Sequence, residues 1–183
     1  MSRFRLNVSM VLGSSLIFLL SFLANQWLFT SSEFIRGINW IYLPAGIRLL
    51  CTLLFGAAGA IGVMITSWIT CFFYFFPDDP VRSFIGGIIS AAAPYLTYRL
   101  AQYAFGLRAS LTNLTTGRLL FLILLYSLAS PSLHHLWFLA RNDDVSAAGY
   151  CVMVIGDLLG SLMVVYTMKM LLSFLPPKAA NVR

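Results

Sequence analysis

The sequence has few charged residues, and this shortage is its most informative feature. Only 10% of the 183 residues are Asp, Glu, Lys or Arg, whereas 60% are hydrophobic. A soluble domain carries about 25% charged residues, which it needs to cover a water-facing surface. A surface that faces lipid needs none. The composition therefore excludes an ordinary soluble protein and predicts that the lipid bilayer surrounds most of the chain.

Cysteine, histidine and catalytic motifs are also scarce. The three cysteines all lie in apolar stretches, and an odd number of such residues excludes a disulfide framework. The sequence contains no Gly-x-Ser-x-Gly elbow, no His-Glu-x-x-His motif and no pair of acids within one apolar segment. We therefore expect no enzymatic activity, no cofactor and no metal site. The net charge of +6 comes from basic residues scattered singly, which excludes a nucleic-acid-binding patch.

Apolar residues instead gather into six segments of about twenty residues, the length that crosses a bilayer as a helix. The apolar stretch 38–76 is too long for one span, and we divide it at the glycine-rich residues 55–59. The segment nearest the N-terminus is longer than a signal-peptide core and is expected to be a retained anchor. The sequence predicts an all-α polytopic transmembrane bundle with no soluble domain and a cytoplasmic tail at 173–183. The helices are expected at 8–29, 38–55, 58–76, 83–105, 119–140 and 147–172.

The distribution of charge predicts how this bundle is oriented, because cytoplasmic loops accumulate Lys and Arg. With the N-terminus inside, every acid outside a predicted helix falls on the outer side, together with only three arginines. The remaining basic residues, apart from Arg48, fall on the inner side. The outer arginines are Arg36, Arg82 and Arg141. We therefore expect a multi-pass protein of a bacterial inner membrane with both termini in the cytoplasm.

Two opposite charges are expected at membrane depth. Asp157 lies ten residues into the segment 147–172, and Arg48 lies at about the same depth in the segment 38–55. Inserting such a group costs about 2.5–3.5 kcal/mol, so an ion pair between the two is the simplest hypothesis. Such a pair would either hold two helices together or form part of a ligand or proton site. Both interpretations stay open on the sequence alone.

Proline and glycine residues lie close to both charges. Pro44 leaves the carbonyl of residue 40 without its helical donor, and Gly46 follows two residues later. This pattern predicts either a polar pocket for an anion or polar head group, or a kink that a neighbouring helix satisfies. Gly156 and Gly160 form a small-xxx-small pattern, which favours close helix packing.

The two histidines, His134 and His135, follow Pro131 in the predicted fifth helix. Adjacent positions of a helix point about 100° apart, so both cannot bind one metal ion from an unbroken helix. We expect them to form hydrogen bonds near the membrane interface as secondary features of the site.

Two stretches resemble a known family. The stretch Tyr42-Leu43-Pro44-Ala45-Gly46-Ile47, followed by Leu54-Phe55-Gly56, is similar to the Trp-x-Pro-Ala-Gly-Ile and later Leu-Gly signature of bacterial MASE-type membrane-associated sensor domains. Residues 156–160, Gly-Asp-Leu-Leu-Gly, resemble the Gly-Asp-x-x-Gly element of a late helix in that family. Tyr42 replaces the family's tryptophan, and six helices are predicted where the family commonly has about eight.

The resemblance implies a sensor-like module that acts through a membrane or cytoplasmic signalling protein, because no output domain follows within these residues. The positions that match are Pro44, Gly46, Gly156, Asp157 and Gly160. Two alternatives remain: a small transporter or the substrate-binding membrane subunit of a multi-subunit importer, and a structural scaffold subunit. Self-association into a homo-oligomer is a further option for the partner.

Overall fold

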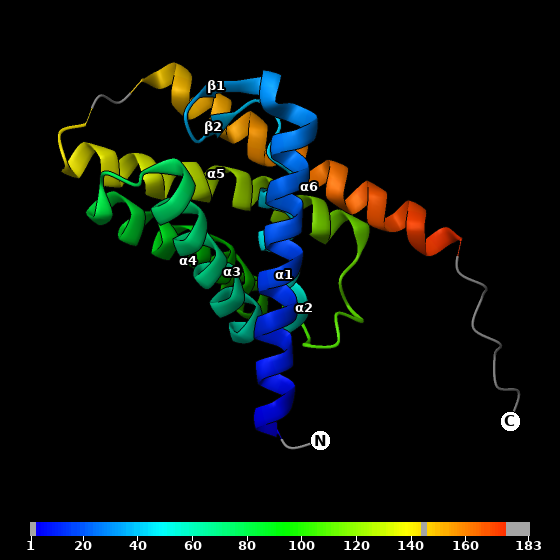
Figure 1. The fold of residues 1–183 in the computed structure, drawn as a ribbon. Helices are drawn as coiled ribbons and strands as arrows, with labels where there is room; N and C mark the ends of the chain where they lie inside the picture. Colours follow the sequence, from blue (N-terminus) through cyan, green and yellow to red (C-terminus); the bar gives the residue numbers. More distant parts are fainter. Residues whose placement is uncertain (1–2, 144–145, 175–183) are drawn as a thin grey trace, which may run out of the picture.

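The computed structural model describes residues 3–143 and 146–174, and it is an all-α helical bundle (Figure 1). The count of six helices and the fold class predicted from the sequence are confirmed. A short 3-10 turn (η1, Thr30–Ser32) and a small hairpin (β1, Glu33–Ile35; β2, Ile38–Asn39) join the first two helices. A π-helical turn (η2, Cys71–Phe75) extends the third. The helices are α1 (Arg3–Phe29), α2 (Leu43–Phe55), α3 (Ala57–Thr70), α4 (Pro80–Phe105), α5 (Thr116–Ala140) and α6 (Ala147–Ser173).

Four of these helices are long and apolar enough to cross a membrane, which makes this chain a membrane protein. They are α1 with η1, α3 with η2, α5 and α6. α4 has sufficient length but is less apolar, and the 13 residues of α2 extend only about 20 Å. A hydrocarbon core of about 30 Å exceeds that length. Among the described residues, four helices therefore meet the criteria of length and composition for crossing a membrane on their own.

The second helix begins five residues later than the sequence predicted. Residues 38–42 were expected to be helical, but Ile38 and Asn39 pair with β1 in an antiparallel hairpin. Gly37 has a φ of +86° at the hairpin turn, a conformation that favours glycine. The chain then bends, and α2 begins at Leu43. Strand pairing supplies backbone hydrogen bonds that a helix would otherwise provide for these residues.

Pro44 consequently starts a helix instead of interrupting one. It lies in the first turn of α2, where a missing backbone N–H costs nothing because that donor would have no helical acceptor. The expected kink, with a freed carbonyl at Trp40, is therefore wrong. The division at the glycine-rich stretch is correct: α2 ends at Phe55, α3 begins at Ala57, and Gly56 between them has a φ of +57°.

The interior of the bundle lies mainly between α2, α4, α5 and α6. Leu49 and Leu53 of α2 pack with Leu122, Ile123 and Tyr126 of α5 in the largest apolar cluster. α1 runs along α3 at one side, and its first turns extend beyond the neighbouring helices (Figure 1). The cluster thus holds α2, a short helix, among longer helices that can cross the membrane.

A polar contact joins the two loops at the end of the bundle where α4 starts and α5 ends. Asp79 accepts a hydrogen bond from the backbone N–H of Arg82 at 2.9 Å, and the Arg141 guanidinium lies 2.8 Å from its other oxygen. Asp143 lies 3.6 Å from the same guanidinium. The helix cap first, and the Arg141 contact second, hold the pKa of Asp79 below its usual range.

We expect Asp79→Asn to destabilise the protein by about 1 kcal/mol at pH 7, mainly because the amide is a weaker partner for Arg141 and Arg82. A carboxylate with a lowered pKa stabilises the folded state above its unfolded pKa of about 3.9 and loses that contribution as the pH falls through the folded value. Thermal unfolding in detergent at pH 7 and pH 3 should therefore show a smaller pH effect in the variant. An equal pH effect in both proteins would contradict this role.

Candidate functional site

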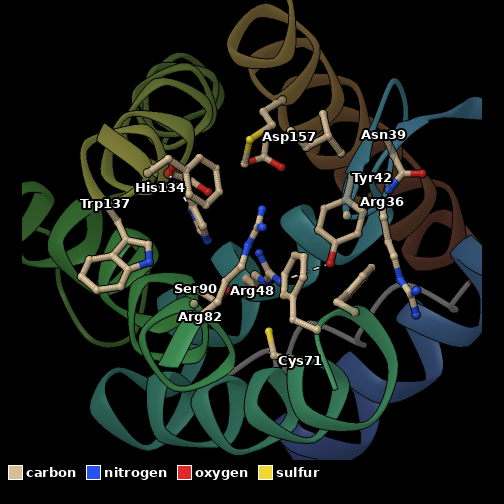
Figure 2. Close-up of a pocket in the computed structure, with 18 residues that line it drawn as sticks. Arg36, Asn39, Tyr42, Arg48, Cys71, Arg82, Ser90, His134, Trp137 and Asp157 are labelled. Carbon is tan, nitrogen blue, oxygen red and sulfur yellow. Dashed lines mark hydrogen bonds between the residues drawn. The ribbon is translucent and has the colours of Figure 1, made fainter. Parts of the chain in front are cut away.

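A polar cavity lies at the end of the bundle that carries the hairpin and the 77–79 loop. The volume open to the centres of water molecules is about 70 Å³, which is enough for several waters. The lining comes from the hairpin, the first turns of α2, α4 and α6, the turn η2 and the last turns of α5. Its charged or polar side chains are those of Arg36, Asn39, Tyr42, Arg48, Cys71, Arg82, Ser90, Ser130, His134, Trp137 and Asp157 (Figure 2).

Arg48 is held deep in this cavity by aromatic side chains. It is only 7% exposed, and its guanidinium carbon lies 4.9 Å from the centre of the Phe18 ring and 5.2 Å from that of Tyr42. One terminal nitrogen donates to the Tyr42 hydroxyl at 3.1 Å. Its Nε is buried and has no hydrogen-bond partner within the described residues. The ring faces stabilise the cation while one donor stays available on the edge of the group.

Asp157 faces the same cavity from α6. It is 5% exposed, Ser130 of α5 is its hydrogen-bonding neighbour, and its Oδ2 is buried without a partner in the described part of the chain. Figure 2 shows its carboxylate directed into the space that Arg48 also faces. The two residues predicted to face each other from α2 and α6 thus line the same cavity.

The direct ion pair, however, is not formed. In the described part of the chain, neither Arg48 nor Asp157 forms a nitrogen–oxygen ion pair within 4.0 Å, whereas Arg141 forms two such contacts, with Asp79 and Asp143. The Arg48 guanidinium is instead turned toward Tyr42 and lies between two rings, so the cavity separates it from Asp157. Each of the two side chains therefore keeps a buried polar atom without a partner in the described residues, which a directly hydrogen-bonded ion pair would satisfy.

The glycines predicted to belong to the site set its geometry through packing. A Cβ atom on Gly156 would lie 2.0 Å from the carbonyl oxygen of Asn39, and one on Gly160 would lie 1.9 Å from that of Tyr42. A Cβ on Gly46 would lie 2.8 Å from Ser161 on α6. The backbone N–H of Tyr42 also donates to the carbonyl of Gly156 at 3.1 Å. Close approach at these glycines brings Asp157, which lies between two of them, to the cavity.

The two predicted histidines have different surroundings, because adjacent positions of a helix point in different directions. His134 lines the cavity, and its Nδ1 lies 2.9 Å from the Ser130 carbonyl oxygen. A carbonyl only accepts, so this Nδ1 carries the proton and Nε2 is an acceptor. His135 is buried between α5 and α6, with its Nδ1 3.0 Å from the Pro131 carbonyl and its ring 5.1 Å from that of Tyr150. The described residues contain no cluster of metal-ligating side chains.

Sequence reasoning missed most of the polar residues that line the cavity, Arg82 among them, and it also missed Asn25 outside the cavity. Arg82 was assigned only to the outer loops, but its side chain lines the cavity, and its guanidinium carbon lies 4.1 Å from the Phe76 ring. Asn25 of α1 supports the site from outside the cavity, because its Oδ1 accepts from the backbone N–H of Leu43 at 2.8 Å and caps α2. The signal for Asn25 was the amide pair Asn25-Gln26 inside an apolar span. Arg82 follows Pro80 by two residues, and this position in the sequence does not indicate where its side chain points.

The models of known protein families, the curated proteins and the solved structures contain no match to this chain.

Proposed function

We propose that this chain is a non-enzymatic membrane module that binds a small polar ligand in the cavity and acts through a partner protein. One observation carries the proposal: Arg48 and Asp157 line the same cavity, and each keeps a buried polar atom, Nε and Oδ2 respectively, without a hydrogen-bond partner in the described residues. Leaving such groups unsatisfied typically costs about 1–3 kcal/mol each, and more when they are charged. A ligand that completes their hydrogen bonds would remove that cost.

The packing around α6 suggests how a bound ligand would be sensed. The N-terminal half of α6 supplies Asp157 and contacts the hairpin and α2 through its glycines. Its other end, residues 166–174, is exposed, with Tyr166 at 70% and Phe174 at 78%. A shift of α6 at the cavity would move this exposed end, which we propose contacts a signalling protein. The likeness of residues 42–47 and 156–160 to MASE-type sensor domains supports the same proposal.

We further propose that both termini lie in the cytoplasm of a bacterial cell, which the asymmetry of Lys and Arg supports. Reporter fusions that distinguish the two compartments should place positions 34, 78 and 143 outside the cytoplasm. Fusions at positions 110 and 178 should report from inside. The cavity would then open toward the outer side, because its lining belongs to the end with the outer loops. A fusion at 178 that reports from outside would contradict this topology.

Ligand binding can be tested without knowing the ligand by filling the cavity. Met153 lines the cavity on α6, whereas Met163 lies on the same helix and is 39% exposed to the surroundings of the bundle. Wild-type protein, Met153→Trp and Met163→Trp should be purified in parallel from membranes, and the small molecules that they retain should be released and identified by mass spectrometry. We expect one compound to accompany the wild-type protein and Met163→Trp but not Met153→Trp. Identical small-molecule profiles from all three proteins would contradict a ligand site here.

One observation also favours a second candidate, the substrate-binding subunit of an importer. All of the lining comes from one end of the bundle, so a solute could reach the cavity from one side of the membrane. A compound identified as above discriminates between the two functions. If cells that express the protein accumulate the labelled compound and the Met153→Trp cells do not, transport is the function. If the protein retains the compound but the cells do not accumulate it, the result supports sensing.

A further inference from the structure

The cavity carries an excess of positive charge that the protein does not neutralise. Three arginines line it, and Asp157 is the one acid among the lining residues. Arg36 lies at the exposed rim, where it donates to the Tyr74 carbonyl oxygen and faces the Tyr74 ring. Arg48 and Arg82 are the arginines of the interior. Two guanidinium groups that share one hollow repel each other unless an anion lies between or beside them.

Both interior guanidinium groups are held in the same manner. Aromatic rings cover their faces: Phe18 and Tyr42 at Arg48, and Phe76 and Phe138 at Arg82, with the latter two at 4.1 and 4.9 Å. The edges of the two groups carry the N–H donors, and the Nε of each is buried without a partner in the described residues. Arg48 uses one terminal nitrogen for the Tyr42 hydroxyl. The stacked faces, together with edge donors that the protein does not fully use, leave a planar fork of the kind that binds carboxylate and phosphate oxygens.

The nearby acids do not supply the missing anion. The Asp79 carboxylate, three residues from Arg82, is engaged by the Arg141 guanidinium and by the backbone N–H of Arg82. Asp143 contacts Arg141 as well. Asp157 uses Ser130 and forms no ion pair with either interior arginine within 4.0 Å. In the described part of the chain, the Arg82 guanidinium thus has aromatic contacts but no carboxylate.

From this arrangement we infer that the cavity binds an oxyanion, a carboxylate or phosphate group held by the edges of Arg48 and Arg82. The same ligand presents a hydrogen-bond donor to Asp157 Oδ2, which can only accept while ionised. This inference rests on the proposed ligand-binding function and specifies its chemical class. The oxyanion belongs either to a water-soluble metabolite or to a lipid head group.

The test uses the purified full chain in nanodiscs of phosphatidylcholine, which has no net charge. Inorganic phosphate and succinate are the anionic probes, succinamide is the neutral analogue of succinate, and ethanolamine is the cationic probe. Chloride at matched ionic strength controls for general salt effects on stability. The thermal-unfolding midpoint is followed against probe concentration, because only specific binding gives a saturable rise. A second set of nanodiscs contains phosphatidylglycerol, which supplies an anionic head group.

Arg82→Gln is the central variant, because Arg82 is partly exposed and its loss should not prevent folding. Arg118→Gln is the matched control: Arg118 also stacks on an aromatic ring, Phe105 at 5.2 Å, but lies at the opposite end of the bundle. We expect phosphate or succinate to raise the unfolding midpoint of the wild-type protein in a saturable way. The apparent affinity for the probe should fall about tenfold or more in Arg82→Gln and stay unchanged in Arg118→Gln. Arg82→Lys should fall between them, because it keeps the charge without the fork.

The outcomes separate the sources of the oxyanion. In one outcome, the unfolding midpoint rises only when phosphatidylglycerol and Arg82 are both present, without a response to soluble anions. That result supports oxyanion binding with a lipid head group as the source. An equal response in Arg82→Gln, a response to succinamide or ethanolamine alone, or no saturable response to any probe or lipid would overturn the inference. If the wild-type protein releases a neutral or cationic compound that Met153→Trp lacks, the oxyanion assignment fails while ligand binding stands.

Discussion

Gly160→Ala is expected to remove most of the folded protein from the membrane. The added Cβ would lie 1.9 Å from the carbonyl oxygen of Tyr42 and 2.3 Å from its carbonyl carbon. Both are backbone atoms, so no side-chain rotation relieves the overlap, and α6 must separate from the start of α2. Overpacking typically costs about 1–3 kcal/mol, and a clash with rigid backbone belongs at or above the upper end of that range. Fluorescence-detected size-exclusion chromatography of detergent extracts would measure the loss.

The matched control for this change is Gly13→Ala. Gly13 also lies within a helix, but a Cβ there would meet no atom within 4 Å. Alanine is a better helix former than glycine by about 0.5–1 kcal/mol, so the control should be neutral or slightly stabilising. Wild-type yield and stability for Gly160→Ala would mean that α6 and α2 do not pack as described here. A loss of folded protein in both variants would point to helix propensity rather than to packing.

The second large effect concerns the two charges of the cavity. We expect Arg48→Ala and Asp157→Ala each to lower the stability of the detergent-solubilised protein by about 3 kcal/mol, because each leaves the electrostatic balance of a buried site disturbed. Arg48→Ala also removes its contacts with Phe18 and Tyr42. The double variant should cost less than the sum of the two single changes, by about 0.5–3 kcal/mol, because each charge acts on the other across the cavity.

Arg99→Ala is the control for these substitutions, since Arg99 is exposed on α4, and its replacement should change stability by no more than about 0.5 kcal/mol. Strict additivity of Arg48→Ala and Asp157→Ala would show that the cavity does not couple them. Function is scored in the same variants by retention of the small molecule. A double variant that regains folded protein but retains no compound supports a ligand site, whereas recovery of both supports a structural role.

Much of the fold could be predicted because hydrophobicity acts locally and nearly additively along the chain. A run of about twenty apolar residues favours a helix at membrane depth, because a helix satisfies its own backbone hydrogen bonds, and six helices therefore follow from the sequence. The turn at Gly56 was also predictable from composition, because glycine permits a positive φ. The start of α2 was not, because residues 38–42 are as apolar as a helix requires. Their pairing with residues 33–35, and the contact of Tyr42 with Gly156, decide otherwise.

The candidate site, like the fold, was predictable from the sequence only in part. The sequence alone determined that Arg48 and Asp157 lie inside the bundle and that Gly156 and Gly160 permit a close approach, because burial cost and side-chain size belong to single residues. Only the tertiary structure decided which partners these charges meet. Arg48 lies between Phe18 and Tyr42, and Arg82 enters the cavity from the start of α4. The direction of a side chain depends on how helices are rotated against one another, and residues distant in the sequence determine that rotation.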